Sequence, residues 1–352
     1  MADTLLKNPW SVNEQAYPYQ GDKKDQLRFL LNYAVLAPSG HNTQPWLFRV
    51  VEDQVELWAD RRRALPVVDP HDRELVMSCG AALFHLRAAL RHFGYRPEIH
   101  LLPEPHSPDL LARVASGAEV PATYNDERMF TAIKRRRTNR APFTPGPLPE
   151  AEIEHLRAAA EDEEARVHVL QAEAPKNALA DLIAEGDRRQ ARDPSFRREL
   201  AAWLHNNRSS SQDGIPGAAF GFGDLLSYAG PFVIRTFDWG EGQAAKDRQL
   251  AEGSPALLVL TTEKDTPRAW MQAGQALGHL LLQAQVYDLQ VSYLNQPVEV
   301  TALRPKVQRL LKTSRHPQLI LRVGYPTKTA APTPRRPTRA VLLKHAPNTA
   351  MP

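Results

Sequence analysis

The same succession of elements is predicted twice along the chain. Apolar residues at helical spacing over 27–35 precede two strand-like runs, WLFRVV and VELWAD, and then a long amphipathic helix over 75–93. Further along, a helix introduced by Pro149 precedes the strand-like run RVHVL at 166–170 and, much later, a second long helix over 270–286. Helices that alternate with hairpin-like strands predict an α+β fold, and the repetition predicts two units built to one plan.

Three further strand-like runs complete the predicted sheets. They are EIHLL, ALLVLTT and LILRVGY, at 98–102, 256–262 and 319–325. Prolines between Pro103 and Pro121 interrupt any regular pattern, so we expect an irregular connection between the units there. We therefore divide the chain into a first unit over 1–125 and a second unit over 126–352.

The composition excludes several classes of function. Lysine and arginine number 44 against 40 acidic residues, a near balance that predicts no nucleic acid as partner. The start MADTLLKNPW has no basic end followed by an apolar run, and no segment approaches the roughly 20 apolar residues of a membrane span. We expect a cytoplasmic protein with no membrane contact and no metal site. The single cysteine, Cys79, lies on the apolar face of a predicted helix, where a core thiol is expected.

The segment 207–242 differs in amino-acid composition from the rest of the chain. It holds seven of the 18 glycines, interleaved with aromatic residues, which predicts a lid, either a mobile flap or an ordered cover, and no regular helix. The proline-rich, basic tail carries an apolar run, 341–343, which predicts that it docks on the folded chain. Four aromatic residues of the lid are candidates to plug a pocket beneath it: Phe220, Phe222, Tyr228 and Phe232.

The stretch APSGHNTQPW, at 37–46, lies between the first helix and the first strand and contains almost no acid–base chemistry. Its small residues allow the backbone to approach a flat ring, and its amide side chains can read donors and acceptors at a ring edge. The residues proposed for this wall of a heterocycle pocket are Pro38, Ser39, Gly40, Asn42 and Gln44. The same residue types also make an ordinary turn.

The run 135–140, RRRTNR, packs four guanidinium groups and one hydroxyl into six residues. Guanidinium forks match phosphate oxygens two at a time, and the hydroxyl of Thr138 completes a cage for a phosphorylated small ligand. The alternatives are a solvated basic helix face and a nucleic-acid patch. The near-neutral charge balance and the lack of aromatic residues within the run argue against the nucleic-acid patch.

The loop 37–46 at the end of a helix and before a hairpin resembles the flavin-contacting loop of the nitroreductase superfamily. In that family the active unit is a dimer, and each FMN lies at the interface between a basic phosphate segment of one subunit and this loop of the other. The run Arg136-Arg137-Thr138-Asn139-Arg140 is similar to the phosphate segment, with threonine in place of serine. The first half of the chain has only the loop and the second half only the basic segment. The resemblance therefore implies a nitroreductase-like three-layer fold duplicated in one chain, with one FMN at the boundary of the halves.

The pattern as a whole resembles the Acg-like twin-domain branch of that superfamily, which implies further contacts with FMN. By this resemblance Tyr293, Leu294, Asn295 and Gln296 line the dimethylbenzene and N5 side of the flavin, while Arg335 and Arg336 return to its phosphate. Arg140 is the candidate cation near N1 and O2 of the ring. The chain departs from the family at Gly278-His279, where an acidic–arginine pair is expected, so no role of that arginine transfers.

The resemblance implies an FMN-dependent oxidoreductase that takes hydride from NAD(P)H and reduces a small nitroaromatic, quinone or similar acceptor. No side chain is required as a catalytic residue, because the flavin ring carries the redox chemistry. The alternative is a non-catalytic protein that binds and sequesters FMN beneath a closed lid; a scaffold with an emptied pocket is the third reading. Because the fusion supplies internally what relatives obtain by dimerisation, we expect a monomer with internal pseudo-two-fold symmetry.

Overall fold

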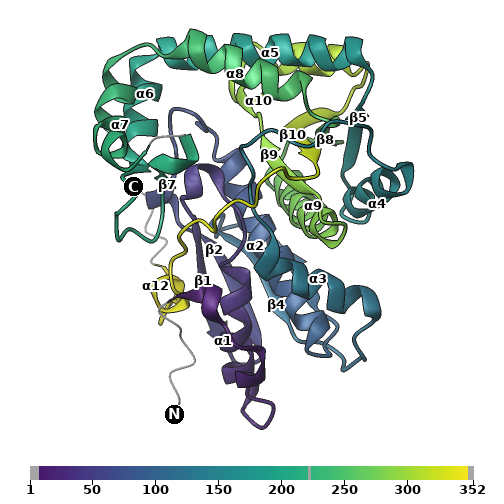
Figure 1. Cartoon of the computed structure of the whole chain (residues 1–352). Coiled ribbons are helices and arrows are strands. Elements are labelled where there is room, and N and C mark those ends of the chain that lie inside the picture. Colours follow the sequence, from purple (N-terminus) through teal and green to yellow (C-terminus); the bar gives the residue numbers. More distant parts are fainter. Residues whose placement is uncertain (1–7, 221–222, 348–352) are drawn as a thin grey trace.

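The computed structural model describes residues 8–220 and 223–347, and within them two four-stranded antiparallel sheets share one topology (Figure 1). The strand order is β1-β2-β4-β3 in the first sheet and β5-β8-β10-β9 in the second, so corresponding strands occupy corresponding positions. The predicted duplication of an α+β unit is confirmed. The strands are β1 (Trp46–Val51), β2 (Gln54–Ala59), β3 (Glu98–Leu101), β4 (Leu110–Ala115), β5 (Arg166–Leu170), β8 (Ala256–Thr262), β9 (Gln290–Tyr293) and β10 (His316–Gly324).

Two equivalent helices of 20 residues each, α2 (Arg73–His92) and α9 (Pro267–Val286), pack on one another at the centre of the molecule. Their backbones touch where Gly80 meets Gly274: a Cβ on Gly80 would stand 2.6 Å from the carbonyl oxygen of Met271, and one on Gly274 would stand 2.1 Å from that of Met77. Only residues without a side chain allow this approach. The glycines of these two helices therefore form the seam between the halves.

Helices cover both faces of the second sheet and give that half three layers. Alternate residues of β8 point to opposite faces: Leu258 and Leu260 pack with α4 and α9, whereas Leu257 and Val259 pack with α5. The first sheet carries α1 and α2, and α3 adds Met129 to the same core. No helix of the described ranges is long and apolar enough to cross a membrane. The remaining bounds in these layers are α1 (Lys23–Ala34), α3 (Tyr124–Arg135), α4 (Glu150–Glu161), α5 (Glu173–Arg192), α10 (Gln296–Glu299) and α11 (Arg304–Leu310).

The expected irregular connection between Pro103 and Pro121 is wrong in part, because it contains the strand β4. This strand lies inside the first sheet, between β2 and β3. Leu110 and Val114 are buried on the first core, and that burial favours the strand. The prolines stand only before and after these residues, so they end neighbouring segments without interrupting the ladder.

The first sheet joins β1 to β2 by a two-residue turn, whereas the second sheet carries a long insertion between β5 and β8. Figure 1 shows α5 and α8 side by side above the second sheet, with α6 and α7 at one end. The predicted lid, 207–242, is part of this insertion. Its elements are α5, α6 (Pro194–Ala202), β6 (Leu204–His205), β7 (Ile215–Pro216), α7 (Asp224–Thr236) and α8 (Gly240–Glu252).

The prediction that 207–242 holds no regular helix is wrong, because α7 and the start of α8 lie within it. Ser227, Gly230 and Ile234 are buried at helical spacing, and α7 packs against α6, so tertiary burial outweighs the low helix propensity of glycine and proline. The predicted plug is also wrong for Tyr228 and Phe232, which are 59% and 57% exposed. Phe222 and the side chain of Phe220 lie outside the described part of the chain.

The C-terminal tail crosses from the second half back to the first (Figure 1). Val341, in the short helix α12 (Thr338–Val341), is fully buried in the first core. Leu342 pairs with Phe48 in a parallel bridge, and the amide of Leu343 donates to the Phe48 carbonyl over 2.7 Å. The first half of the molecule is thus completed by chain from the second.

Candidate active site

The loop after α1 has an unusual backbone. His41, Asn42 and Gln44 all have positive φ, at 47°, 55° and 51°. Such angles are uncommon for residues other than glycine and cost conformational energy, so the surroundings must hold the loop in place. Two contacts begin to do so: the hydroxyl of Ser39 accepts from the Gln44 amide over 2.9 Å, and that of Ser78 on α2 accepts from the Gly40 amide over 3.4 Å.

Side-chain amides of the loop join it to the insertion and to the tail. The Nδ2 atom of Asn42 donates to the carbonyls of Gly214 and Pro334, at 2.9 and 3.1 Å. Gln44 is fully buried; its Nε2 donates to the Gln212 carbonyl over 2.8 Å, and its Oε1 accepts from the Arg336 amide over 2.7 Å. Three segments that are far apart in sequence therefore meet at this loop.

Two buried arginines converge behind the loop. Arg136, at the end of α3, and Arg335, in the tail, are only 3% and 4% exposed, and each places Nη2 on the Leu36 carbonyl oxygen, at 3.5 and 3.3 Å. Within the described residues, Nε and Nη1 of Arg136 and Nε of Arg335 have no hydrogen-bond partner. Burial lowers the pKa of Arg136 to about 10; burial, and after it the charge of Arg136, lowers the pKa of Arg335 well below its ordinary value.

This arrangement is unfavourable as it stands. Two like charges share a buried space, and buried cationic N–H groups without acceptors carry a large desolvation cost. A dianionic group with several acceptor oxygens would compensate both the charge and the missing hydrogen bonds. The arginine pair therefore has the chemistry of an anion site.

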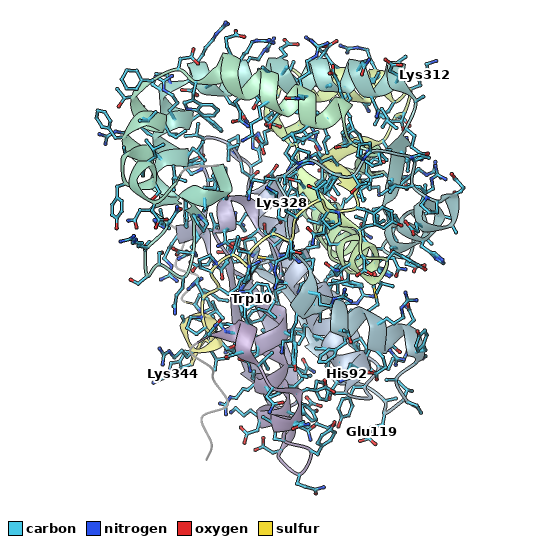
Figure 2. All side chains as sticks on the ribbon, viewed as in Figure 1. Trp10, His92, Glu119, Lys312, Lys328 and Lys344 are labelled. Carbon is cyan, nitrogen blue, oxygen red and sulfur yellow. The ribbon has the colours of Figure 1, made fainter. Side chains whose placement is uncertain are left out.

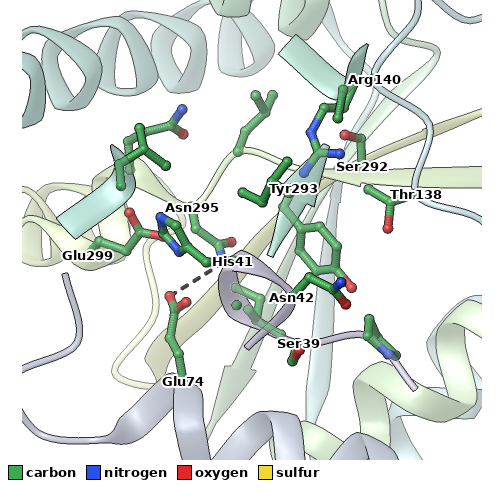
Figure 3. Close-up of a pocket in the computed structure, with 18 of the residues that line it drawn as sticks. Ser39, His41, Asn42, Glu74, Thr138, Arg140, Ser292, Tyr293, Asn295 and Glu299 are labelled. Atoms are coloured by element: carbon green, nitrogen blue, oxygen red, sulfur yellow. Dashed lines mark hydrogen bonds between the residues drawn. The ribbon is translucent and has the colours of Figure 1, made fainter. Parts of the chain in front are cut away.

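A cavity opens between the loop, the end of β9 and the insertion. Figure 3 shows Ser39 and Asn42 of the loop facing Tyr293 and Asn295, with Arg140 on the far side. Eleven of the fifteen predicted site residues line this cavity: Pro38, Ser39, Gly40, Asn42, Thr138, Arg140, Tyr293, Leu294, Asn295, Gln296 and Arg335.

The other four predicted residues lie outside the lining. Gln44 and Arg336 bind one another and the loop backbone, with Nη1 of Arg336 on the Gln44 carbonyl at 3.1 Å. Arg137 donates to the carbonyls of Lys134 and Arg136 and stacks on Trp10, 4.6 Å from its ring centre. Figure 2 labels Trp10 beside the tail. Arg136 stands behind the lining with its free N–H groups.

Cys79 and His279, which were not predicted as site residues, occupy structural positions. Cys79 is buried, with its thiol on the Pro45 carbonyl at 3.3 Å. The ring of His279 stacks on Phe84 at 4.7 Å, and its Nδ1 lies 3.6 Å from a carboxylate oxygen of Glu163, so a carboxylate partner comes from another element and not from its own helix.

A sequence profile described as "Nitroreductase family" matches residues 133–325, more than half of the chain. The chain belongs to the nitroreductase family. A Mycobacterium tuberculosis H37Rv protein with the provisional name NAD(P)H nitroreductase Rv3131 is 32% identical over 317 residues, covering 90% of this chain and 89% of the relative. The acg protein of the same strain, provisionally named an NAD(P)H nitroreductase, is 27% identical over 321 residues, with 90% and 94% covered.

Solved structures similar to this nitroreductase-family chain include two that carry FMN. Iodotyrosine deiodinase bound to FMN and 3-iodo-L-tyrosine has a TM-score of 0.40 and 18% identity, and the match covers 59% of this chain and 94% of the deiodinase. A nitroreductase with bound FMN from Bacteroides fragilis NCTC 9343 has a TM-score of 0.37 and 13% identity, with 58% and 90% covered. The two mycobacterial relatives thus match this chain nearly end to end, whereas these solved chains match little more than half of it.

Sequence reasoning missed one wall of the nitroreductase cavity. Four carboxyl groups line it, each from a different helix: Glu74 on α2, Asp187 on α5, Asp247 on α8 and Glu299 on α10. Burial raises the pKa of each, to about 7 for Glu299 and to about 8 for Asp187. No local motif marks them, because each occupies an ordinary polar position in its own helix. The insertion adds an apolar part of the lining with Phe196, Leu200, Ile215 and Trp239.

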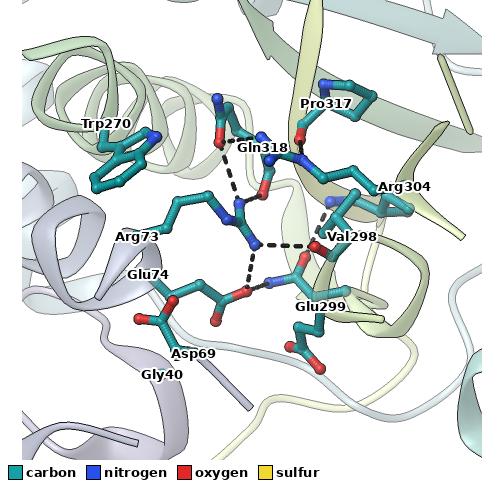
Figure 4. A network of polar contacts seen from close by, with 12 residues as sticks. Gly40, Asp69, Arg73, Glu74, Trp270, Val298, Glu299, Arg304, Pro317 and Gln318 are labelled. Atoms are coloured by element: carbon teal, nitrogen blue, oxygen red, sulfur yellow. Dashed lines mark hydrogen bonds and ion pairs between the residues drawn. The ribbon is translucent and has the colours of Figure 1, made fainter. Parts of the chain in front are cut away.

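A buried network joins this wall to the seam between the halves (Figure 4). Arg73 of α2 donates to the carbonyls of Gln318 and Val298, at 2.6 and 3.2 Å, and to Glu74 at 3.3 Å. The same Glu74 oxygen accepts from Asn295 over 3.4 Å. A charged pair of the first half thereby fixes Asn295 of the second half at the cavity.

Proposed function

We propose that this chain binds FMN and works as an NAD(P)H-dependent oxidoreductase that reduces a small acceptor such as a nitroaromatic compound or a quinone. The observation that carries the proposal is the buried pair Arg136 and Arg335 beside a cavity walled by the loop 38–42: among the described residues, Nε and Nη1 of Arg136 and Nε of Arg335 have no acceptor. The family membership supports an oxidoreductase of this type.

The residues present fit FMN at both of its ends. The phosphate would be held by Arg136 and Arg335, with Thr138 at the cavity wall as a further donor. The ring would lie between the loop and Tyr293–Gln296. Arg140 stands where it can balance negative charge on a reduced ring. When bound, FMN supplies hydride chemistry, and the protein's task is to orient the ring and the acceptor.

Gln44, Arg137 and Arg336 would contribute to the site indirectly. Their polar groups contact backbone carbonyls or one another, so we propose that they hold the loop and the basic segment in the binding geometry. His41 lines the cavity, and desolvation, followed by the charge of Arg140, lowers its pKa to about 4. It would meet an acceptor as a neutral imidazole at pH 7.

A second function, sequestration of FMN beneath a fixed lid, is favoured by one observation. The base of the lid at 212–214 is tied to the first half by Gln44, Asn42 and an ion pair between Arg63 and Asp213. Such ties oppose opening of the cover. The exposed side chains of Tyr228 and Phe232 argue against a plug formed by these two residues.

Anaerobic titration of the purified protein with NADPH and then NADH separates the two functions. Bleaching of a flavin absorption spectrum by nicotinamide establishes the reductase. A spectrum that changes only with dithionite establishes sequestration. A protein that is colourless and does not take up added FMN would contradict both.

The site itself is tested by replacing Arg136 and Thr138 together by alanine. We expect the flavin content of the purified protein to fall at least tenfold, because the phosphate loses its charge-assisted hydrogen bonds. Arg135→Ala is the matched control, since this neighbouring arginine is exposed and paired with Asp288 at 2.5 Å. Unchanged flavin content in the double variant would show that the phosphate lies elsewhere.

A further inference from the structure

Two carboxyl groups of the insertion share one amide at the edge of the cavity. Nε2 of Gln296 donates to Oδ1 of Asp187 over 2.9 Å and to Oδ2 of Asp247 over 3.0 Å. Asp187 is 2% exposed and Asp247 is 7% exposed. The second oxygen of Asp187, Oδ2, is buried and has no hydrogen-bond partner among the described residues. All three residues line the cavity.

Such a pair cannot hold two full negative charges at neutral pH without strong repulsion. The charged groups that face the pair are Arg188 on α5, Lys246 on α8, Glu299 on α10, Arg322 on β10 and Arg140 at the cavity wall. Arg322 is committed to the carbonyls of Asn139 and Ala141, at 2.8 and 3.0 Å, through its Nη2 atom. Burial, and after it the charge of Asp247, raises the pKa of Asp187 to about 8.

We propose that Asp187 and Asp247 hold one proton between them and that Asp187 donates it to the acceptor reduced in this cavity. The unpartnered Oδ2 is the oxygen that carries the proton. The inference rests on the proposed function and deepens it, because it selects acceptors whose two-electron reduction consumes a proton at the site, with quinones as the simplest class.

The step balances for a quinone. One end of the quinone takes a hydride, which is two electrons and one hydrogen nucleus, from the reduced cofactor of the proposed function. The other carbonyl oxygen forms an O–H bond with the proton of Asp187, whose own O–H bond breaks. The products are a hydroquinone and the Asp187 carboxylate, which recovers a proton from solvent through the carboxyl pair.

Infrared spectroscopy tests proton storage independently of turnover. As the pH rises from 6 to 9, Glu299 also loses a proton, near pH 7. We expect the wild type to lose further protonated-carboxyl C=O intensity near pH 8, and Asp187→Asn to lack that change. Asp181→Asn, an exposed carboxylate on the same helix, is the matched control and keeps it. Asp247→Asn should move the loss to lower pH, because the like charge beside Asp187 is gone. An unaltered band in Asp187→Asn would overturn the proposal.

Oxidation of the dithionite-reduced holoprotein tests proton delivery. At pH 7 we expect Asp187→Asn to react at least tenfold more slowly with benzoquinone and at an unchanged rate with ferricyanide, which takes electrons without a proton. Equal slowing with both oxidants, or with neither, would overturn the step. A wild-type protein that binds no FMN would instead overturn the proposed function and with it the transfer, while the infrared band still decides on proton storage.

Discussion

At the scale of single residues, the cavity is built from groups that a stable fold would avoid. Three positive-φ residues form the loop, two arginines meet without enough acceptors, and four carboxyls share one wall. Strain and unpaired charge are tolerated where the surrounding structure enforces them, and they concentrate at functional sites. Each of these features therefore predicts a measurable conflict between stability and binding.

Replacing Arg136 by methionine should separate the effect of this arginine on stability from its effect on FMN binding. The substitution keeps a long apolar side chain and removes a buried charge whose pKa burial has lowered to about 10. We expect the ligand-free protein to gain on the order of 2 kcal/mol in unfolding free energy, and added FMN to cause no further rise in Tm. Thermal denaturation with and without FMN measures both. A ligand-free variant less stable than the wild type would mean that Arg136 is held by compensating contacts.

The carboxyl pair predicts a second conflict, with a defined pH dependence. The pKa of Asp187 in the fold, about 8, exceeds the ordinary value near 3.9, so the stability linked to its proton is lost as the pH rises through 8. Between pH 5 and pH 9 the wild type should lose on the order of 3 kcal/mol relative to Asp187→Asn. Urea unfolding at both pH values, with Asp181→Asn as control, measures the difference. A constant difference would show that Asp187 is ionised throughout.

Sequence reasoning found the parts of the site whose chemistry is local. Three short segments could be recognised from the types of residue that stand next to one another: the loop 38–42, the run around Thr138 and the stretch 293–296. The structure brings all three to one cavity. The carboxyl wall was not found, because Glu74 and Glu299 are 225 positions apart and meet only through the packing of the halves. Tertiary contacts of this kind leave no periodic or compositional signal.

At the scale of elements, prediction from sequence succeeded where apolar residues recur at one regular spacing. It failed where burial in the fold outweighed the local helix or strand propensity. The long helices and the hairpin follow from repeated apolar spacing. The strand β4 lies among prolines, and α7 contains Gly230 and Pro231, so their residues argue against the elements that packing imposes. In both cases the buried face, at Val114 or Ile234, decides the outcome.

The close contact between α2 and α9 predicts that a side chain added at Gly274 will destabilise the fold. Gly274→Ala would place a Cβ 2.1 Å from the Met77 carbonyl oxygen, a backbone atom that can move only with its helix. We expect a loss of about 3 kcal/mol in unfolding free energy. Gly242→Ala in α8 is the matched control, since no atom lies within 4 Å of its added Cβ and helix propensity favours alanine. Equal stability of the two variants would mean that the helices separate at little cost.

At the scale of the whole molecule, the chain after residue 125 crosses between the two sheets and back. The strand-like segment at Thr138 leaves α3 and pairs with Val291 of the second sheet, while the tail returns to pair Leu342 with Phe48. A nitroreductase-family dimer would need two chains for such exchanges, whereas this chain makes them internally. On α7, the side chains of Tyr228 and Phe232, four positions apart on one face of the helix, are exposed.

We predict a monomer, and α7 makes the prediction specific. Two equivalent helices, α2 from the first half and α9 from the second, already pack on one another within the chain, so light scattering should give the mass of a single chain at micromolar concentration. A mass of two chains would contradict this and would point to the exposed apolar face of α7, because contiguous exposed apolar groups mark association sites. The double variant Tyr228→Ser and Phe232→Ser then shows whether such a dimer forms through α7 or through another surface. A dimer that dissociates in this variant associates through α7, whereas a dimer that persists must use a surface outside it.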